Sequence, residues 1–161
     1  MENRTKHTYG TALYEFAKNI LVVCPNCGGK ALVRPNDPDL KVFEIREVKV
    51  VCAACGFNKT LDGISHRQDP KQKRGKILVF GAPIDPYFHL PLWLQAEFSG
   101  ELLWAYNLEH LDFLAAHVGA KLRERNQANA PRSVGSRLPR WMSSAANREA
   151  VLKLIEKLRE K

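Results

Sequence analysis

The chain of 161 residues lacks any long apolar run. A membrane-spanning helix needs about 20 consecutive apolar residues, and no stretch of this sequence approaches that length, so we expect no association with a membrane. The first residues, Met1-Glu2-Asn3-Arg4, are polar, and no apolar segment follows that would indicate a secretory signal peptide. A chain without a signal peptide stays in a reducing compartment, where disulfides are rare. The sequence therefore predicts a cytoplasmic protein.

The signature motifs of common enzyme classes are also absent. The sequence has no glycine-rich phosphate loop, no nucleophile elbow, no His-Glu metalloprotease helix and no acidic cluster that could hold Mg²⁺. Its acidic residues are scattered, mostly beside Lys or Arg. We therefore expect a protein without catalytic activity, although an active site assembled from distant residues would leave no trace in the sequence.

Cysteine is scarce, and its placement is the most informative feature of the chain. All four cysteines fall into two Cys-x-x-Cys pairs, Cys24 with Cys27 and Cys52 with Cys55. Four thiolates complete the tetrahedral coordination of Zn²⁺ and leave no position for water or a substrate. Each pair follows an apolar, β-branched run and so ends a strand, whereas a thioredoxin-type redox centre uses one pair at the start of a helix. We predict that these cysteines bind one structural zinc ion, with redox or disulfide use as the alternative.

The spacing resembles that of the zinc-ribbon family, over roughly residues 20–62, with the four cysteines as the matching ligands. The resemblance implies a small antiparallel β-structure around the metal. Zinc ribbons bind DNA, RNA or other proteins, and some only hold a larger protein together, so the fold alone selects no function. The whole chain is also similar to small bacterial zinc-ribbon proteins of unassigned role, which implies a bacterial origin.

The rest of the sequence predicts an α+β fold in three parts. These are an N-terminal segment with the ribbon (1–62), a basic linker (63–76), and a C-terminal β-hairpin with two helices (77–161). The ribbon is expected to pack on, or to be linked to, a small antiparallel sheet covered by those helices. This division follows from the polar composition of the linker and the apolar patterns on either side of it.

Local patterns predict the individual elements. Alternating apolar residues predict strands at 42–46 and 76–80, and a hairpin pairing 90–95 with 101–106. Asn107 is typical of a helix N-cap, and the apolar stripe that follows extends to Leu122. A terminal helix is expected after Ser144 or Asn147.

Aromatic side chains are concentrated between residues 87 and 106. The flanking apolar pattern favours core positions for Trp93 and Trp104, together with Leu92, Leu94, Leu102 and Leu103. We expect Tyr87, Phe88 and Tyr106 to be the more exposed aromatic residues, and exposed aromatic rings beside cations are suited to stacking on nucleic-acid bases. His110 and His117 are two helical turns apart, too far to share a metal ion, and are expected at the surface or at the edge of the core.

The chain is basic, with a formal net charge of +8 and a pI near 9.5. Four thiolates and one Zn²⁺ lower this charge by about two, so the metal-loaded chain stays basic. Seven cations lie in two polar stretches: Arg67, Lys71, Lys73, Arg74, Arg132, Arg137 and Arg140. We expect these residues to contact phosphates of a nucleic acid, with solvated loops as the alternative.

Two functions therefore compete at the level of sequence. The first is a zinc-ribbon protein that binds nucleic acid, with DNA as one candidate, through its basic loops. The second is a protein-interaction adaptor that docks on a larger assembly, such as the transcription or translation machinery, through the apolar face of the last helix or residues 87–94.

Overall fold

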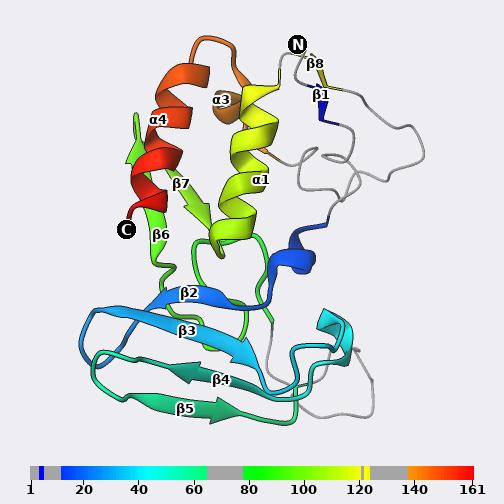
Figure 1. Ribbon diagram of the computed structural model, residues 1–161, viewed down its shortest axis with the longest axis vertical. Coiled ribbons are helices and arrows are strands. Elements are labelled where there is room, and N and C mark those ends of the chain that lie inside the picture. The colour runs from blue at the N-terminus through cyan, green and yellow to red at the C-terminus, as the bar shows by residue number, and fades with distance from the viewer. Residues whose placement is uncertain (1–3, 6–11, 65–77, 121, 124–137) are drawn as a thin grey trace. The chain divides into compact units, whose positions relative to one another are not determined.

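The computed structural model describes residues 4–5, 12–64, 78–120, 122–123 and 138–161 (Figure 1). The fold is α+β, as predicted, with a four-stranded antiparallel sheet, a two-stranded hairpin and helices. It divides into two compact units. Tyr14–Trp93 form the sheet unit, and Met1–Leu13 with Leu94–Lys161 form the helical unit. From residue 65 onward, the predicted linker lies outside the described residues.

The sheet unit is built around one four-stranded sheet, whose strands follow sequence order. They are β2 (Ile20–Val23), β3 (Lys30–Pro35), β4 (Val48–Val51) and β5 (Asn58–Leu61), each antiparallel to its neighbour. Their β-branched and leucine-rich composition suits a pleated surface with one buried side. The sequence correctly predicts β2 and β4, each of which ends immediately before a cysteine pair.

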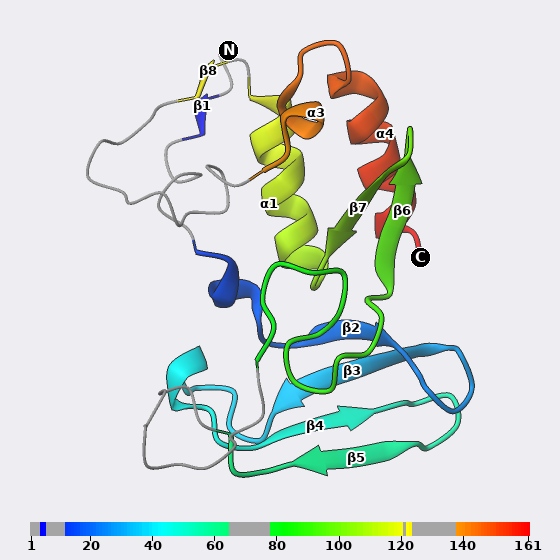
Figure 2. The same cartoon turned by 180° about the vertical axis from the view of Figure 1, so that it is seen from behind.

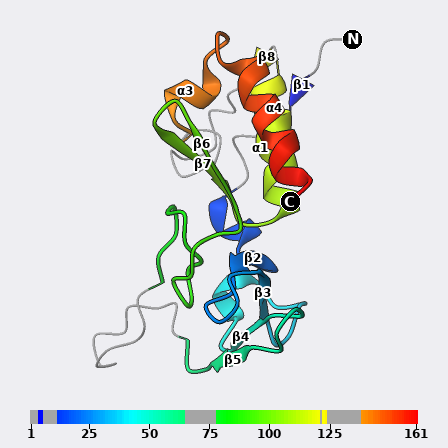
Figure 3. The same cartoon turned by 90° about the vertical axis from the view of Figure 1, so that its left-hand side faces the viewer.

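One face of this sheet is buried. Ile20, Val33 and Val50 occupy neighbouring positions across β2, β3 and β4 and are almost inaccessible to solvent. The segment 78–93 lies on one side of the sheet (Figure 3). Its Leu92 is fully buried and pairs with Val22, so this segment also extends the edge of the sheet at β2.

Two predicted strands of the sheet unit are corrected by the structure. Residues 42–44 form a 3₁₀ turn, η2 (Val42–Glu44), because Val42 and Ile45 are buried three positions apart while Phe43 is 51% exposed. The Glu44 carboxylate accepts a hydrogen bond of 2.9 Å from the Lys41 N–H, which closes the turn. Residues 78–80, the described part of the second predicted strand, form no strand.

Asp85 organises the turn that follows. Its carboxylate is fully buried and accepts hydrogen bonds from the backbone N–H groups of Tyr87, Phe88 and Leu90, at 2.9, 2.7 and 2.6 Å. Burial raises the pKa of Asp85, while these three N–H groups act in the opposite direction. Tyr87, expected to be exposed, is instead buried, and its hydroxyl donates to the Ala17 carbonyl at 3.3 Å.

The helical unit contains the predicted hairpin, but its first strand begins at Leu94 and extends to Phe98, whereas the sequence predicts residues 90–95. Strands β6 (Leu94–Phe98) and β7 (Glu101–Ala105) pair antiparallel. The two-residue turn between them places Ser99 and Gly100 at positive φ, the geometry of a type I′ hairpin turn. A short parallel pair, β1 (Arg4–Thr5) with β8 (Leu122–Arg123), belongs to the same unit.

The described part of the helical unit also has the helices α1 (Leu108–Gly119), α3 (Arg140–Ser143) and α4 (Arg148–Arg159). Helices α1 and α4 pack side by side, and α4 also packs on β6 (Figure 2). Leu111 and Leu114 of α1 and Ile155 of α4 are buried. Helix α1 ends at Gly119, before the predicted Leu122, which lies in β8.

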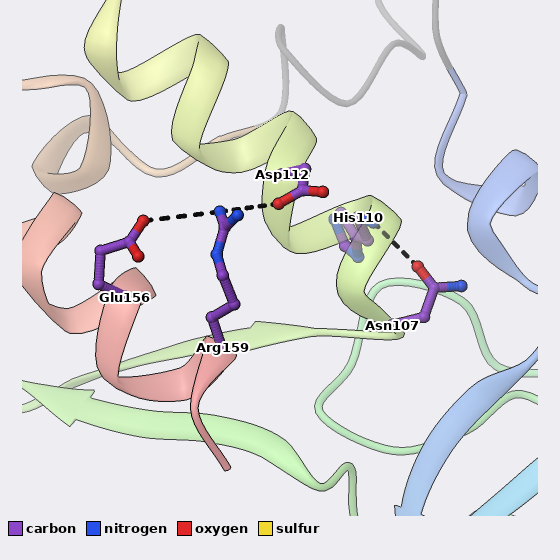
Figure 4. Close-up of polar contacts among 5 residues, drawn as sticks. All are labelled: Asn107, His110, Asp112, Glu156 and Arg159. Atoms are coloured by element: carbon purple, nitrogen blue, oxygen red, sulfur yellow. Dashed lines mark hydrogen bonds and ion pairs between the residues drawn. The ribbon is translucent and has the colours of Figure 1, made fainter.

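Polar contacts hold the start of α1 in place (Figure 4). The Asn107 side chain caps the helix by accepting a bond of 2.9 Å from the His110 N–H, as its sequence position predicts. His110 is buried rather than exposed, because its Nδ1 accepts the backbone N–H of Tyr106 at 3.1 Å. Burial lowers the pKa of His110 to about 3, so the ring is neutral at physiological pH.

The other predictions for apolar and aromatic residues are confirmed only in part. Leu92, Leu94 and Leu103 are buried as expected, whereas Leu102 is 42% exposed. Trp93, Trp104 and Phe88 are half-buried. Tyr106 and His117 were expected at or near the surface and are buried. Among the described residues, no helix is long and apolar enough to cross a membrane.

Candidate metal centre

The four cysteines come together at one end of the four-stranded sheet. The turn between β2 and β3 carries Cys24 and Cys27, and the turn between β4 and β5 carries Cys52 and Cys55. Because β2 and β4 run in the same direction within the antiparallel sheet, both turns lie at the same end. We call these turns the first and second knuckle. The predicted clustering of the four sulfurs is confirmed: all lie within 4.8 Å of one another.

The distances between sulfurs fit one tetrahedral metal ion. A Zn–S bond of about 2.3 Å with tetrahedral angles places neighbouring thiolate sulfurs about 3.8 Å apart. The Sγ atoms of Cys24 and Cys55 are 3.7 Å apart, and those of Cys27 and Cys52 are 3.6 Å apart. All four cysteines are free thiols. The four cysteines are therefore positioned to coordinate one ion, consistent with a single structural zinc.

The two knuckles have the same backbone hydrogen bonds. In the first, the Cys24 N–H donates to Gly29 O at 2.7 Å and the Gly28 N–H donates to Cys24 O at 2.9 Å. In the second, the Cys52 N–H donates to Phe57 O and the Gly56 N–H to Cys52 O, at 2.8 and 2.9 Å. Gly28 and Gly56 have φ values of 72° and 76°, a region that residues with a Cβ rarely adopt.

Hydrogen-bond donors also point at the sulfurs. The backbone N–H groups of Asn26 and Gly29 lie 3.4 Å from the Sγ atoms of Cys24 and Cys27, respectively. The side-chain amide of Asn26 reaches across to the second knuckle and lies 3.4 Å from Cys55 Sγ. Such donors stabilise the negative charge of metal-bound thiolates. The sequence gives no sign of the role of Asn26, which depends on the knuckles meeting in space.

The two exposed thiols differ in acidity. The hydrogen bond from Asn26, with a further one from the Phe57 N–H, lowers the pKa of Cys55 to about 6. The Gly29 N–H lowers the pKa of Cys27, but the neighbouring sulfurs of Cys52 and Cys55 raise it to about 12. At these distances the negative charges of two thiolates repel each other, so the sulfurs are not all deprotonated together unless a cation lies between them. A divalent metal supplies that cation, and its binding releases protons.

The arrangement is closed and therefore structural. Cys24 and Cys52 are buried, and Cys27 and Cys55 face solvent. With four thiolate ligands, a tetrahedral ion has no open position for water or a substrate. When bound, the ion cross-links the two knuckles and so ties β2, β3, β4 and β5 together at one end.

A hollow of about 360 Å³ lies beside the knuckles, on the sheet face that the segment 78–93 covers. Its walls are Pro25, Asn26, Val50, Phe57, Lys59, Phe88 and Leu90. The sequence does not predict this hollow, because its walls come from segments more than 20 residues apart.

Most of the predicted nucleic-acid contacts lie outside the described residues. These are Arg67, Lys71, Lys73, Arg74, Arg132 and Arg137. Arg140 is described: it is exposed and is the first residue of α3. In the same helix, Trp141 stacks on Phe98 with ring centroids 5.3 Å apart, which holds α3 on the hairpin.

Comparison of the chain with protein-family models, with curated proteins and with solved structures gives no match. The metal site therefore rests on the geometry of the four cysteines alone.

Asn26→Ala is expected to weaken zinc binding about tenfold, because Cys55 Sγ loses a donor that stabilises its negative charge. Asn58→Ala is the matched control, since the Asn58 amide lies near the other knuckle but donates to the Gly56 carbonyl at 3.2 Å instead of to a sulfur. Competition with a fluorescent zinc chelator measures both affinities. Equal affinities for the two variants would show that the Asn26 amide does not act on the metal.

Proposed function

We propose that this protein is a non-catalytic, zinc-ribbon nucleic-acid-binding protein. One zinc ion holds the ribbon in shape, and cationic side chains contact the phosphates. The observation that carries the proposal is the closed four-cysteine site in a chain with a formal charge of +8. A closed site offers no metal chemistry to a substrate, and a basic surface attracts polyanions.

The distribution of charge favours the stretch 126–140 over helix α4 as the source of phosphate contacts. Two cations of α4 are engaged with carboxylates. Lys153 lies 2.9 Å from Glu149, and Arg159 lies 2.7 Å from Asp112, as Figure 4 shows. By contrast, the predicted phosphate contacts Arg132, Arg137 and Arg140 belong to a stretch without acidic residues. A stretch of sequence with cations and no acidic residues suits contact with phosphates.

Much of the apolar surface that the adaptor alternative would use is buried. Val151, Ile155 and Leu158 of α4 are buried within the helical unit, where α4 packs on α1 and β6. In the segment 87–94, Tyr87, Leu92 and Leu94 are buried. A charge at Ile155 would therefore unfold the unit instead of testing a docking surface. These observations favour nucleic-acid binding over docking on a protein assembly.

Fluorescence anisotropy tests the proposal with labelled single-stranded DNA, duplex DNA and structured RNA, each at two salt concentrations. We expect saturable binding that weakens steeply with salt, because phosphate contacts release counterions. Replacing Arg132, Arg137 and Arg140 together by Gln should reduce the dependence of log K on log salt by about 2 for a single strand. A zinc-loaded wild-type protein that binds none of the three ligands at low salt would refute the proposal.

A further inference from the structure

The two faces of the four-stranded sheet differ in character. Alternate residues of β2 to β5 form the buried face described above. We call the opposite side the open face; its strand residues are Leu21, Val23, Lys30, Leu32, Arg34, Lys49, Val51, Asn58 and Thr60. All of these residues are partly or fully exposed to solvent, while their neighbours along β2, β3 and β4 are buried.

An apolar row crosses the centre of the open face. Leu21, Leu32 and Val51 are aligned in register across β2, β3 and β4. Because Leu92 pairs with Val22 and is buried, the half-buried Trp93 lies at the edge of the open face, and its N–H donates to the Leu21 carbonyl at 2.9 Å. The row therefore ends in an aromatic ring.

Cations flank this row on both sides. On the side of the knuckles, the Lys30 ammonium lies 5.9 Å from the centre of the Trp93 ring. On the other side, Arg34 and Lys49 stand directly opposite each other on β3 and β4. Lys30 and Arg34 are four residues apart on one strand, which corresponds to about 13 Å.

Arg34 and Lys49 repel each other across the sheet, and an anion bound beside them would relieve that repulsion. Like charges at directly opposed positions of a sheet are destabilising, and among the described residues neither side chain forms an ion pair with a carboxylate. Strands β2 to β5 contain no Asp or Glu. The nearest carboxylates in sequence are Asp37, three residues after Arg34, and Glu47, two residues before Lys49; both lie outside the strands, at the end away from the knuckles.

We infer that the open face binds a single strand of nucleic acid, with phosphates at Arg34 and Lys49 and unpaired bases on the row from Trp93 to Val51. This inference rests on the proposed nucleic-acid binding and identifies its substrate class and surface. Apolar and aromatic side chains between cations suit unpaired bases, whose flat faces are accessible. A duplex stacks those faces inside and presents its phosphates instead.

The test compares Lys49→Gln with Lys59→Gln. Both lysines belong to neighbouring strands of the same sheet, but Lys59 pairs with the buried Val50 and so lies on the opposite face. Binding of the zinc-loaded, full-length variants to a labelled 20-nucleotide oligothymidine and to a 20-base-pair duplex is measured by anisotropy. Zinc content and the melting temperature are measured alongside as a check of folding.

We expect Lys49→Gln to weaken binding of the single strand severalfold and Lys59→Gln to leave it unchanged. The double variant Arg34→Gln with Lys49→Gln should bind the single strand at least tenfold more weakly. The slope of log K against log salt should fall by about 1.4. Its melting temperature should be no lower than that of the wild type, because a repulsive pair is removed. Wild-type protein should bind the single strand more tightly than the duplex.

The outcomes separate this inference from the proposed function. If the wild type binds nucleic acid but the double variant binds equally well, or if Lys59→Gln is as harmful as Lys49→Gln, the open face is not the site and the proposed function stands. Equal binding of duplex and single strand would overturn the substrate class. If the wild type binds neither ligand nor structured RNA, both proposals fail.

Discussion

Cys52→Ser is expected to lose the zinc ion and to unfold the sheet unit. Cys52 is buried and its sulfur lies 3.6 Å from that of Cys27, so its loss opens the centre of the site. In zinc-finger peptides a structural zinc contributes about 10–16 kcal/mol, and this binding energy is also folding energy. The few strands of the sheet unit do not supply a core large enough to offset such a loss.

The measurement combines zinc content with hydrogen exchange of the amides in β2 to β5. Hydrogen exchange is read locally, so it reports on the sheet unit even if the helical unit stays folded. Ala53→Ser is the matched control, because residue 53 lies in the same knuckle, is exposed and is not a ligand. A Cys52→Ser protein that kept its zinc, its amide protection and its melting temperature would contradict a structural metal site.

Asp85→Ala is expected to destabilise the sheet unit by about 3–5 kcal/mol. The substitution leaves the N–H groups of Tyr87, Phe88 and Leu90 without their acceptor in a buried turn. An unsatisfied buried donor costs about 1–3 kcal/mol. The turn also places Tyr87 and Leu92 against the sheet, so its loss exposes apolar surface as well.

Two further variants make this second prediction specific. Asp85→Asn keeps one acceptor oxygen and should lose about half as much stability as Asp85→Ala. Asp62→Ala removes an exposed carboxylate and should change the free energy of unfolding by less than about 0.5 kcal/mol. Urea denaturation measures all three. Equal stabilities of Asp85→Ala and Asp62→Ala would show that the hydrogen bonds of Asp85 do not hold the turn.

The sequence predicts the metal site well because its determinants are local. Two residues separate the cysteines of each pair. Each pair also follows a β-branched run, which favours a strand that ends at the site. The existence of the hairpin and the Asn107 cap are predicted for the same reason, because turns and caps are set by neighbouring residues. The two-residue type I′ turn itself is not predicted.

Features that depend on distant residues are missed. Phe43 and Ile45 fit the alternation of a strand, and only the burial of Val42 together with Ile45, three positions apart, shows that residues 42–44 form a turn. Tyr106 and His110 are buried because the His110 ring accepts the Tyr106 N–H, a contact that hydropathy does not reveal. Likewise, which face of the sheet is left open depends on the packing of the segment 78–93.

The most direct test of the account is X-ray absorption at the zinc K-edge, together with native mass spectrometry of the intact chain. The account predicts one zinc ion per chain, surrounded by four sulfur atoms at about 2.3 Å and by no nitrogen or oxygen ligand. A chain without zinc, or a zinc ion with fewer than four sulfur ligands, would contradict it.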